Sequence, residues 1–91
     1  MIFTWDIEKE KKNIEKHGFS FKIAKSLFTD PYRVDCIDDR NEYGEERHNL
    51  FAKAFDLIFM MCYVLRGDSV RIISLRRANQ RERRKHYRKD S

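Results

Sequence analysis

The spacing of apolar residues changes near Pro31, from a helical period before it to a strand-like period after it. A short apolar stretch at residues 2–5 opens the chain. Asp6 can then cap a first helix with its side-chain oxygen. That helix is predicted to end near His17, with Gly18 as its left-handed terminator. Its apolar stripe is thin, so it should be a surface helix.

A second helix is predicted between Ser20, which can cap it, and Pro31, which stops it. Its buried side comprises the apolar residues Ile23, Ala24, Leu27 and Phe28. Short stripes of this kind are stabilised mainly by packing against the rest of the protein. We therefore expect the helical half to lie on a sheet formed by the second half.

Four strands are predicted after Pro31. Their approximate ranges are 32–36, 47–54, 57–65 and 70–76, with a polar loop at 38–45 and a tight turn at 55–56. The third strand, LIFMMCYVL, is apolar on both faces and suits the centre of a sheet. The predicted fold is α+β: a single domain over 1–91, with two N-terminal helices packed on a mostly antiparallel four- to five-stranded sheet.

The last predicted element is a basic helix over residues 80–88, followed by a tail to residue 91. Asn79 and Glu82 have the spacing of a capping box, which marks its start. Apart from Tyr87 the helix carries almost nothing apolar, so no buried stripe holds it down. We expect it to be poorly protected from amide exchange until a partner binds.

The positive charge is concentrated in this last part of the chain. Residues 71–91 carry a net charge of +7, whereas the whole chain carries +5. Such a segment is expected to meet phosphate or an acidic partner. The alternative is a solvated run of charge that fulfils no binding role.

Cysteine and histidine spacing argues against a metal site. Cys36 and Cys62 lie in separate strand-like stretches, and we expect two free, buried thiols. The three histidines form no ligand motif, so neither a metal nor another cofactor is expected. The start of the chain lacks a signal sequence, and no apolar run is long enough for a membrane span. We expect a cytoplasmic protein.

Three stretches together resemble one family. They are WDIEKEKKNIEKHGFSFKIAKSLFTDP (5–31), YGEER (43–47) and RGDSVRIISLRRANQRER (66–83). The chain is similar to the BrnT toxins, the ribonuclease half of a bacterial type II toxin–antitoxin pair. The resemblance implies a RelE-like fold and cleavage of RNA without metal. It also implies neutralisation by a ribbon-helix-helix-type, BrnA-like antitoxin, in a complex that binds operator DNA, with no role for a membrane.

Four residues are candidates for catalysis: Arg76, Arg47, Glu46 and His17. Arg76 ends the last strand and can clamp a phosphate with its planar fork; its alternative role is an ion pair with Glu45 or Glu46. Arg47, the last residue of GEER, is expected on the neighbouring strand, or is an ordinary surface arginine. His17 titrates near neutrality, but also suits a helix C-terminus.

Proton transfer is left open between Glu46, His17, His48 and Tyr87. Because successive strand residues point to opposite faces, His48 should face away from Arg47. Glu82 is explained by its capping role alone.

Four further residues are candidate RNA contacts: Arg71, Arg77, Arg83 and Tyr87. Arg83 can instead dock the antitoxin. A second hypothesis remains beside the ribonuclease: a non-catalytic basic module that binds RNA, DNA or an acidic protein through the last helix.

Overall fold

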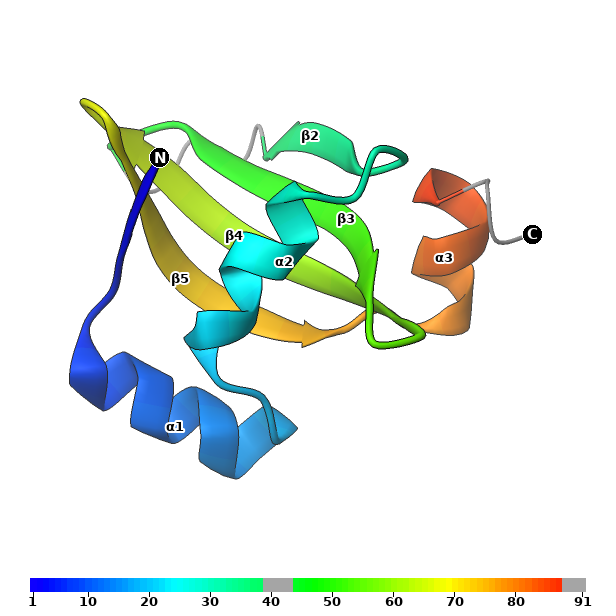
Figure 1. The fold of residues 1–91 in the computed structure, drawn as a ribbon, viewed down its shortest axis with the longest axis horizontal. Helices are drawn as coiled ribbons and strands as arrows, with labels where there is room; N and C mark the ends of the chain where they lie inside the picture. The colour runs from blue at the N-terminus through cyan, green and yellow to red at the C-terminus, as the bar shows by residue number, and fades with distance from the viewer. Residues whose placement is uncertain (39–43, 88–91) are drawn as a thin grey trace.

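The computed structural model describes residues 1–38 and 44–87 (Figure 1). Its elements in order are β1 (Ile2–Thr4), α1 (Ile7–His17), the 3₁₀ helix η1 (Phe21–Ile23), α2 (Ala24–Phe28), β2 (Val34–Asp38), β3 (Arg47–Ala54), β4 (Leu57–Arg66), β5 (Ser69–Arg77) and α3 (Gln80–His86). The predicted order is confirmed, with the 3₁₀ helix as an addition. Most of the predicted polar loop, and the tail from Arg88, lie outside the described residues.

The strands form one sheet in the order β1-β5-β4-β3-β2. Neighbours from β2 to β5 run antiparallel, and β1 is parallel to β5. The apolar strand β4 lies at the centre, as its sequence predicts. A bulge in the β4–β5 ladder falls between Cys62 and Tyr63. These residues pair with Ser74 and Ile72, so Ile73 is the extra residue on β5.

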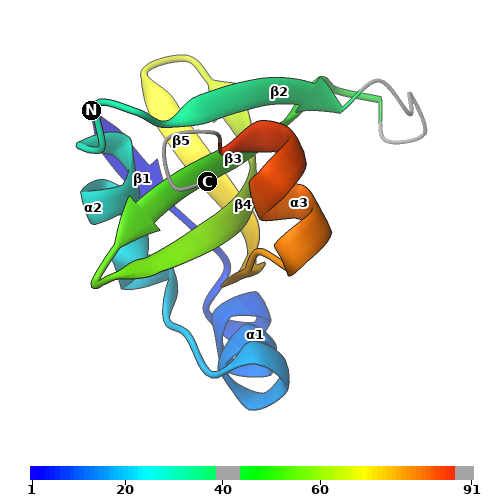
Figure 2. The ribbon, with the colours of Figure 1, turned by 90° about the vertical axis from the view of Figure 1, so that its right-hand side faces the viewer.

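One face of the sheet is covered by η1 and α2 (Figure 2). The fully buried Phe21, Leu27 and Phe59 belong to the main core on this side. Aromatic rings meet edge to face: Phe19 lies 4.9 Å from Phe59, between ring centroids. Aromatic burial of this kind supplies much of a small domain's stability. The predicted apolar side of the second helix is therefore confirmed.

Helix α1 is a surface helix, as predicted, but its attachment to the sheet is polar. Its apolar residues Ile7 and Ile14 are 64% and 43% exposed, and the only buried residue of α1 is Asn13. The Asn13 amide donates to the carbonyl of Leu75 (2.7 Å) and accepts from the Leu75 N–H (3.1 Å). The Asn13 side chain thus makes the two hydrogen bonds to Leu75 that a neighbouring strand would make. Strand β1 pairs with β5 only as far as Arg71, so Asn13 binds β5 beyond the end of β1. A polar anchor, and no apolar stripe, holds the helix.

Helix α3 covers part of the opposite face of the sheet (Figure 2). A second, smaller core lies there, formed by Phe51, Ile58, Ala78 and Tyr87. The His86 ring stacks on Phe51 at 4.2 Å. As predicted, α3 has no buried stripe, because none of its residues is buried. Tyr87, just past its end, is buried and acts as its anchor.

The anchor of Tyr87 is the buried carboxylate of Asp30. This carboxylate accepts hydrogen bonds from the Tyr87 hydroxyl (2.6 Å), the Lys53 N–H (2.8 Å) and the Tyr32 N–H (2.9 Å). Burial acts to raise the pKa of Asp30, but the hydrogen bonds outweigh burial and the pKa lies below its ordinary value. One side chain therefore ties the end of the helical half, β3 and the C-terminal helix together.

Both cysteines are free thiols, as predicted. Cys62 is buried, whereas Cys36 is only partly buried and lies 3.6 Å from the Nδ1 atom of His86.

The turn between β3 and β4 yields a first prediction. Phe55 and Asp56 both have positive φ, 52° and 63°, which suits a type I′ hairpin turn but strains residues with side chains. Asn and Gly prefer these positions. The double variant F55N/D56G should raise the free energy of unfolding by about 1 kcal/mol. Thermal and urea unfolding measure this gain; unchanged or lower stability would contradict the proposed strain.

Asp30 yields a second prediction. A carboxyl with a lowered pKa in the folded state stabilises the protein above its unfolded pKa, and loses this effect as the pH falls through the folded value. At neutral pH, Asp30→Asn should lower the free energy of unfolding by about 1–3 kcal/mol. An amide nitrogen in place of Oδ2 cannot accept the hydrogen bonds of the Lys53 N–H and the Tyr87 hydroxyl, which both bond to Oδ2. The difference from the wild type should shrink below about pH 4. Urea unfolding across pH tests this.

Tyr87→Phe is the matched control, since it removes only the hydroxyl bond and should cost about 1 kcal/mol. A cost for Asp30→Asn that does not change with pH would show that the carboxylate charge is unimportant.

Candidate functional site: the junction of β5 and α3

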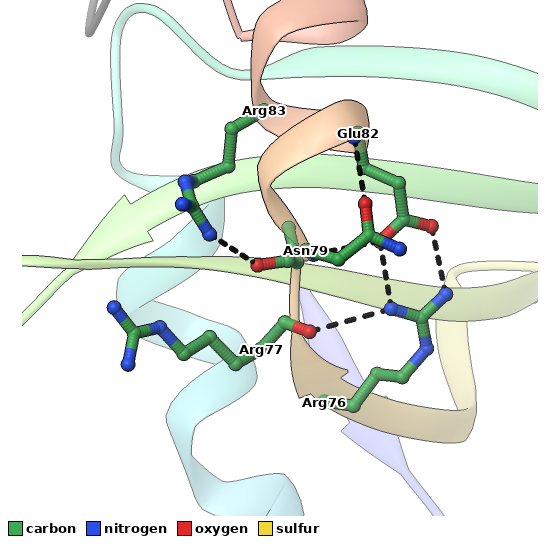
Figure 3. Close-up of polar contacts among 6 residues, drawn as sticks. Arg76, Arg77, Asn79, Glu82 and Arg83 are labelled. Carbon is green, nitrogen blue, oxygen red and sulfur yellow. Dashed lines mark hydrogen bonds and ion pairs between the residues drawn. The ribbon is translucent and has the colours of Figure 1, made fainter.

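Arg76 and Glu82 form an ion pair where β5 passes into α3 (Figure 3). The Nη1 and Nη2 atoms of Arg76 each lie 2.8 Å from one carboxylate oxygen of Glu82. Nη1 also donates to the backbone carbonyl of Arg77 at 3.3 Å. Such a two-pronged pair fixes the plane of the guanidinium as well as its position.

Glu82 is held by the start of its own helix. Its carboxylate accepts from the Asn79 N–H (2.9 Å), and its N–H donates to the Asn79 side chain (2.8 Å), which confirms the predicted capping box. The hydrogen bond from Arg76 lowers the pKa of Glu82, and the same contact raises the pKa of Arg76. Both groups are therefore charged at neutral pH.

The alternative partners predicted for Arg76 are wrong. Glu45 pairs with Arg66 at 2.9 Å, and Glu46 lies near His48. The register of β5 and the start of α3 decide this choice, and neither can be read from charge alone. Glu82 has a second role beside capping, which the sequence interpretation missed.

His17 is a second titratable group on which the charge of Arg76 acts. It ends α1, the helix that Asn13 joins to β5. Partial burial is the main cause that lowers the pKa of His17, and the positive charges of Lys16 and Arg76 act in the same direction. A neutral imidazole that can accept a proton is thereby favoured at this junction.

The four predicted RNA contacts occupy different surroundings. Arg83 is half-buried and donates to the Ala78 carbonyl at 2.7 Å (Figure 3). Arg71 pairs with Val64, and Arg76 pairs with Met60. Residues five apart on a regular strand point to opposite faces, but the bulge between them adds one residue to β5. Both arginines therefore lie on the face that α3 covers. Arg77 pairs with Phe59, which belongs to the main core, so Arg77 lies on the opposite face of the sheet from Arg76. Tyr87 is buried, which does not fit the predicted contact with RNA.

Arg47 and Glu46 lie at the other end of the sheet. Arg47 begins β3, which β4 separates from β5, so the predicted adjacency to Arg76 is wrong. Met60, the partner of Arg76, pairs with Phe51, which lies farther along β3 than Arg47. The two arginine backbones are roughly 10 Å apart across the sheet and roughly 13 Å apart along it.

A network of titratable groups surrounds the start of β3. The Nδ1 atom of His48 lies 3.0 Å from Asp35, and its Nε2 atom lies 3.5 Å from Glu46. The His48 ring stacks on Tyr63, whose hydroxyl donates to Asp35. Burial and then the Asp35 contact raise the pKa of Tyr63 above its ordinary value. His48 faces the main core, away from Arg47, as the alternation predicts. The role of Asp35 depends on the β2–β3 register, which no local pattern in the sequence encodes.

Residues 1–38 and 44–87 contain no group of three acidic, histidine or cysteine side chains arranged to hold a metal ion. None of the helices in this described part is long and apolar enough to cross a membrane.

The fold and the junction define a small basic α+β protein with an arginine fixed at the boundary between sheet and helix. The family described as "Ribonuclease toxin, BrnT, of type II toxin-antitoxin system" matches residues 5–82. The chain belongs to this family, which confirms the resemblance. No curated protein matches the chain.

The effect of the Arg76 charge on the pKa of His17 yields a third prediction. His17 should titrate below the ordinary histidine pKa, and Arg76→Gln should raise its pKa. The variant removes a nearby positive charge and leaves the Glu82 carboxylate uncompensated, so both changes favour the imidazolium. The rise should be partial, because burial remains. NMR titration of the His17 ring measures it, with the exposed Arg84→Gln as control. If the pKa of His17 is the same in Arg76→Gln and Arg84→Gln, the charge of Arg76 does not act on His17.

Proposed function

We propose that the chain is an endoribonuclease that cleaves RNA without a metal ion and arrests bacterial growth. The family of ribonuclease toxins supports the reaction class. In the proposed step, a base removes the proton from a ribose 2′-hydroxyl, and the oxygen attacks the adjacent phosphorus. The bond to the 5′ oxygen breaks, and that oxygen takes up a proton. Negative charge grows on the phosphoryl oxygens and must be stabilised.

Arg76 is the proposed cation and His17 the proposed base. The observation that carries this assignment is the guanidinium that Glu82 fixes. The pKa of His17 is lowered mainly by burial and to a smaller extent by the charges of Lys16 and Arg76, which supports the role of a base. A fixed donor stabilises the transition state without being reorganised during the reaction. A neutral imidazole is the form that accepts a proton.

The surrounding arginines provide binding along the RNA backbone. Arg71 shares the α3 face with Arg76, and Arg83 lies on the helix beside the pair. The exposed cations of α3 (Arg81, Arg84 and Lys85) extend this positive surface. Arg77 lies on the opposite face from Arg76, so it would contact RNA only where the RNA strand passes around the end of the sheet. Glu46 and Arg47 lie too far along the sheet to share the phosphate at Arg76, so we give them no part in this step.

We infer the biological setting from the same family. A type II system pairs a toxin with a protein antitoxin, and we propose a ribbon-helix-helix-type antitoxin for this chain. The complex would bind operator DNA, and the toxin would act in the cytoplasm. The positive net charge suits an acidic segment of the antitoxin. We also infer a RelE-like fold, supported by helices that precede an antiparallel sheet.

Cleavage by purified variants is the fourth prediction. The wild type should cut bacterial RNA in the presence of EDTA. Arg76→Ala should lose about a hundredfold or more in rate, because one preorganised donor is removed. Arg76→Lys should recover only part, since a point charge cannot replace the planar fork. Arg84→Ala, on the exposed side of α3, should weaken binding slightly and leave the rate almost unchanged.

Circular dichroism and urea unfolding establish that each variant is folded, and growth after induction tests the cellular effect. A folded Arg76→Ala that cuts RNA at the wild-type rate would remove Arg76 from the site. RNA binding without cleavage by the wild type would favour the second hypothesis, a non-catalytic basic module.

A further inference from the structure

We propose that Glu82 is a positioning residue that orients Arg76 so that a second edge of its guanidinium faces the scissile phosphate. This inference rests on the proposed function and adds a residue to it. It assigns Glu82 a role in the reaction without contact between Glu82 and the substrate.

The first step of the argument is the geometry of the guanidinium. Arginine has five N–H groups in one plane. The pair with Glu82 uses one N–H of Nη1 and one of Nη2, and the Arg77 carbonyl takes the other N–H of Nη1. The N–H of Nε and the outer N–H of Nη2 remain. They are parallel, and no hydrogen bond within the described part of the chain uses them.

Those two parallel N–H groups match the spacing of two phosphate oxygens. The Arg76 side chain is 31% exposed, which leaves it open to a ligand. Glu82, at 22%, is the more enclosed partner. The carboxylate thus occupies one edge of the fork while the other edge stays available.

The second step is the rigidity of Glu82 itself. It is fixed through Asn79 by both halves of the capping box. Asn79 follows the buried Ala78, whose N–H donates to the carbonyl of Ile58 on β4 at 2.9 Å. Arg83 donates to the carbonyl of Ala78 at 2.7 Å. The capping box and the contact of Arg83 are shown in Figure 3, and the backbone hydrogen bond of Ala78 to Ile58 joins this segment to the sheet.

The third step separates positioning from charge. Glu82 partly neutralises Arg76, so it cannot strengthen the attraction of RNA in the ground state. Glu82 must therefore act by orienting the guanidinium of Arg76. This orientation lowers the barrier of the reaction, because negative charge develops on the phosphoryl oxygens in the transition state. Loss of Glu82 should therefore lower kcat while KM stays the same or falls.

The experiment measures kcat and KM on a short RNA oligonucleotide for Glu82→Gln and for a matched control, Glu8→Gln. It then repeats Glu82→Gln in an Arg76→Ala background. Glutamine keeps the size of the side chain but loses the charged pair with Arg76. We expect kcat to fall roughly tenfold to a hundredfold, with KM unchanged or lower. Glu8→Gln makes the same chemical change at an exposed glutamate near the start of α1, outside this network, so its kcat should change less than about twofold.

In the Arg76→Ala background, Glu82→Gln should reduce kcat by less than about twofold, because the group that it positions is absent. Three results would overturn the inference: wild-type kcat for Glu82→Gln, an equal loss for Glu8→Gln, or a full additional loss in the Arg76→Ala background. An active wild type with any of these results leaves the proposed function intact. An inactive wild type overturns the proposed function and the inference together.

Discussion

The structure depends on the burial of both faces of β4. This strand is apolar on each side, and Ile58, Met61 and Val64 are almost completely removed from solvent. A strand of this kind must be covered twice, because apolar surface left in water is costly. The helical half of the chain supplies one cover. Among the residues that the structure describes, the short basic helix α3 and Tyr87 after it lie over part of the other face.

The basic helix compensates for its lack of an apolar stripe by being fastened at both ends. At its start, Asn79 and Glu82 complete the capping box, and Glu82 also holds Arg76. At its end, Tyr87 reaches the buried carboxylate of Asp30. The cations between these anchors remain on the surface. A segment that would fray by itself thus presents its positive charge in a defined place.

The two polar networks at opposite ends of the sheet have different physical character. The network at the β5–α3 junction joins an arginine to a carboxylate and lies near a histidine whose pKa is lowered. The network around Asp35 joins His48 and Tyr63 across β2, β3 and β4. The proposed chemistry is placed at the first network because it holds a cation fixed by an ion pair, and the charge of this cation acts on a histidine whose pKa is lowered.

The sequence by itself determined the order of the elements, the central place of β4 and the start of α3, because these follow from local periods and caps. It also indicated the family, and it named Arg76 and His17 among four candidate catalytic residues. Tertiary structure decided which groups meet. Glu82 became the partner of Arg76, Arg47 lay beyond an intervening strand, and Tyr87 turned inward to Asp30. These contacts depend on strand register, on one bulge and on the packing of distant segments, and a local pattern encodes none of them.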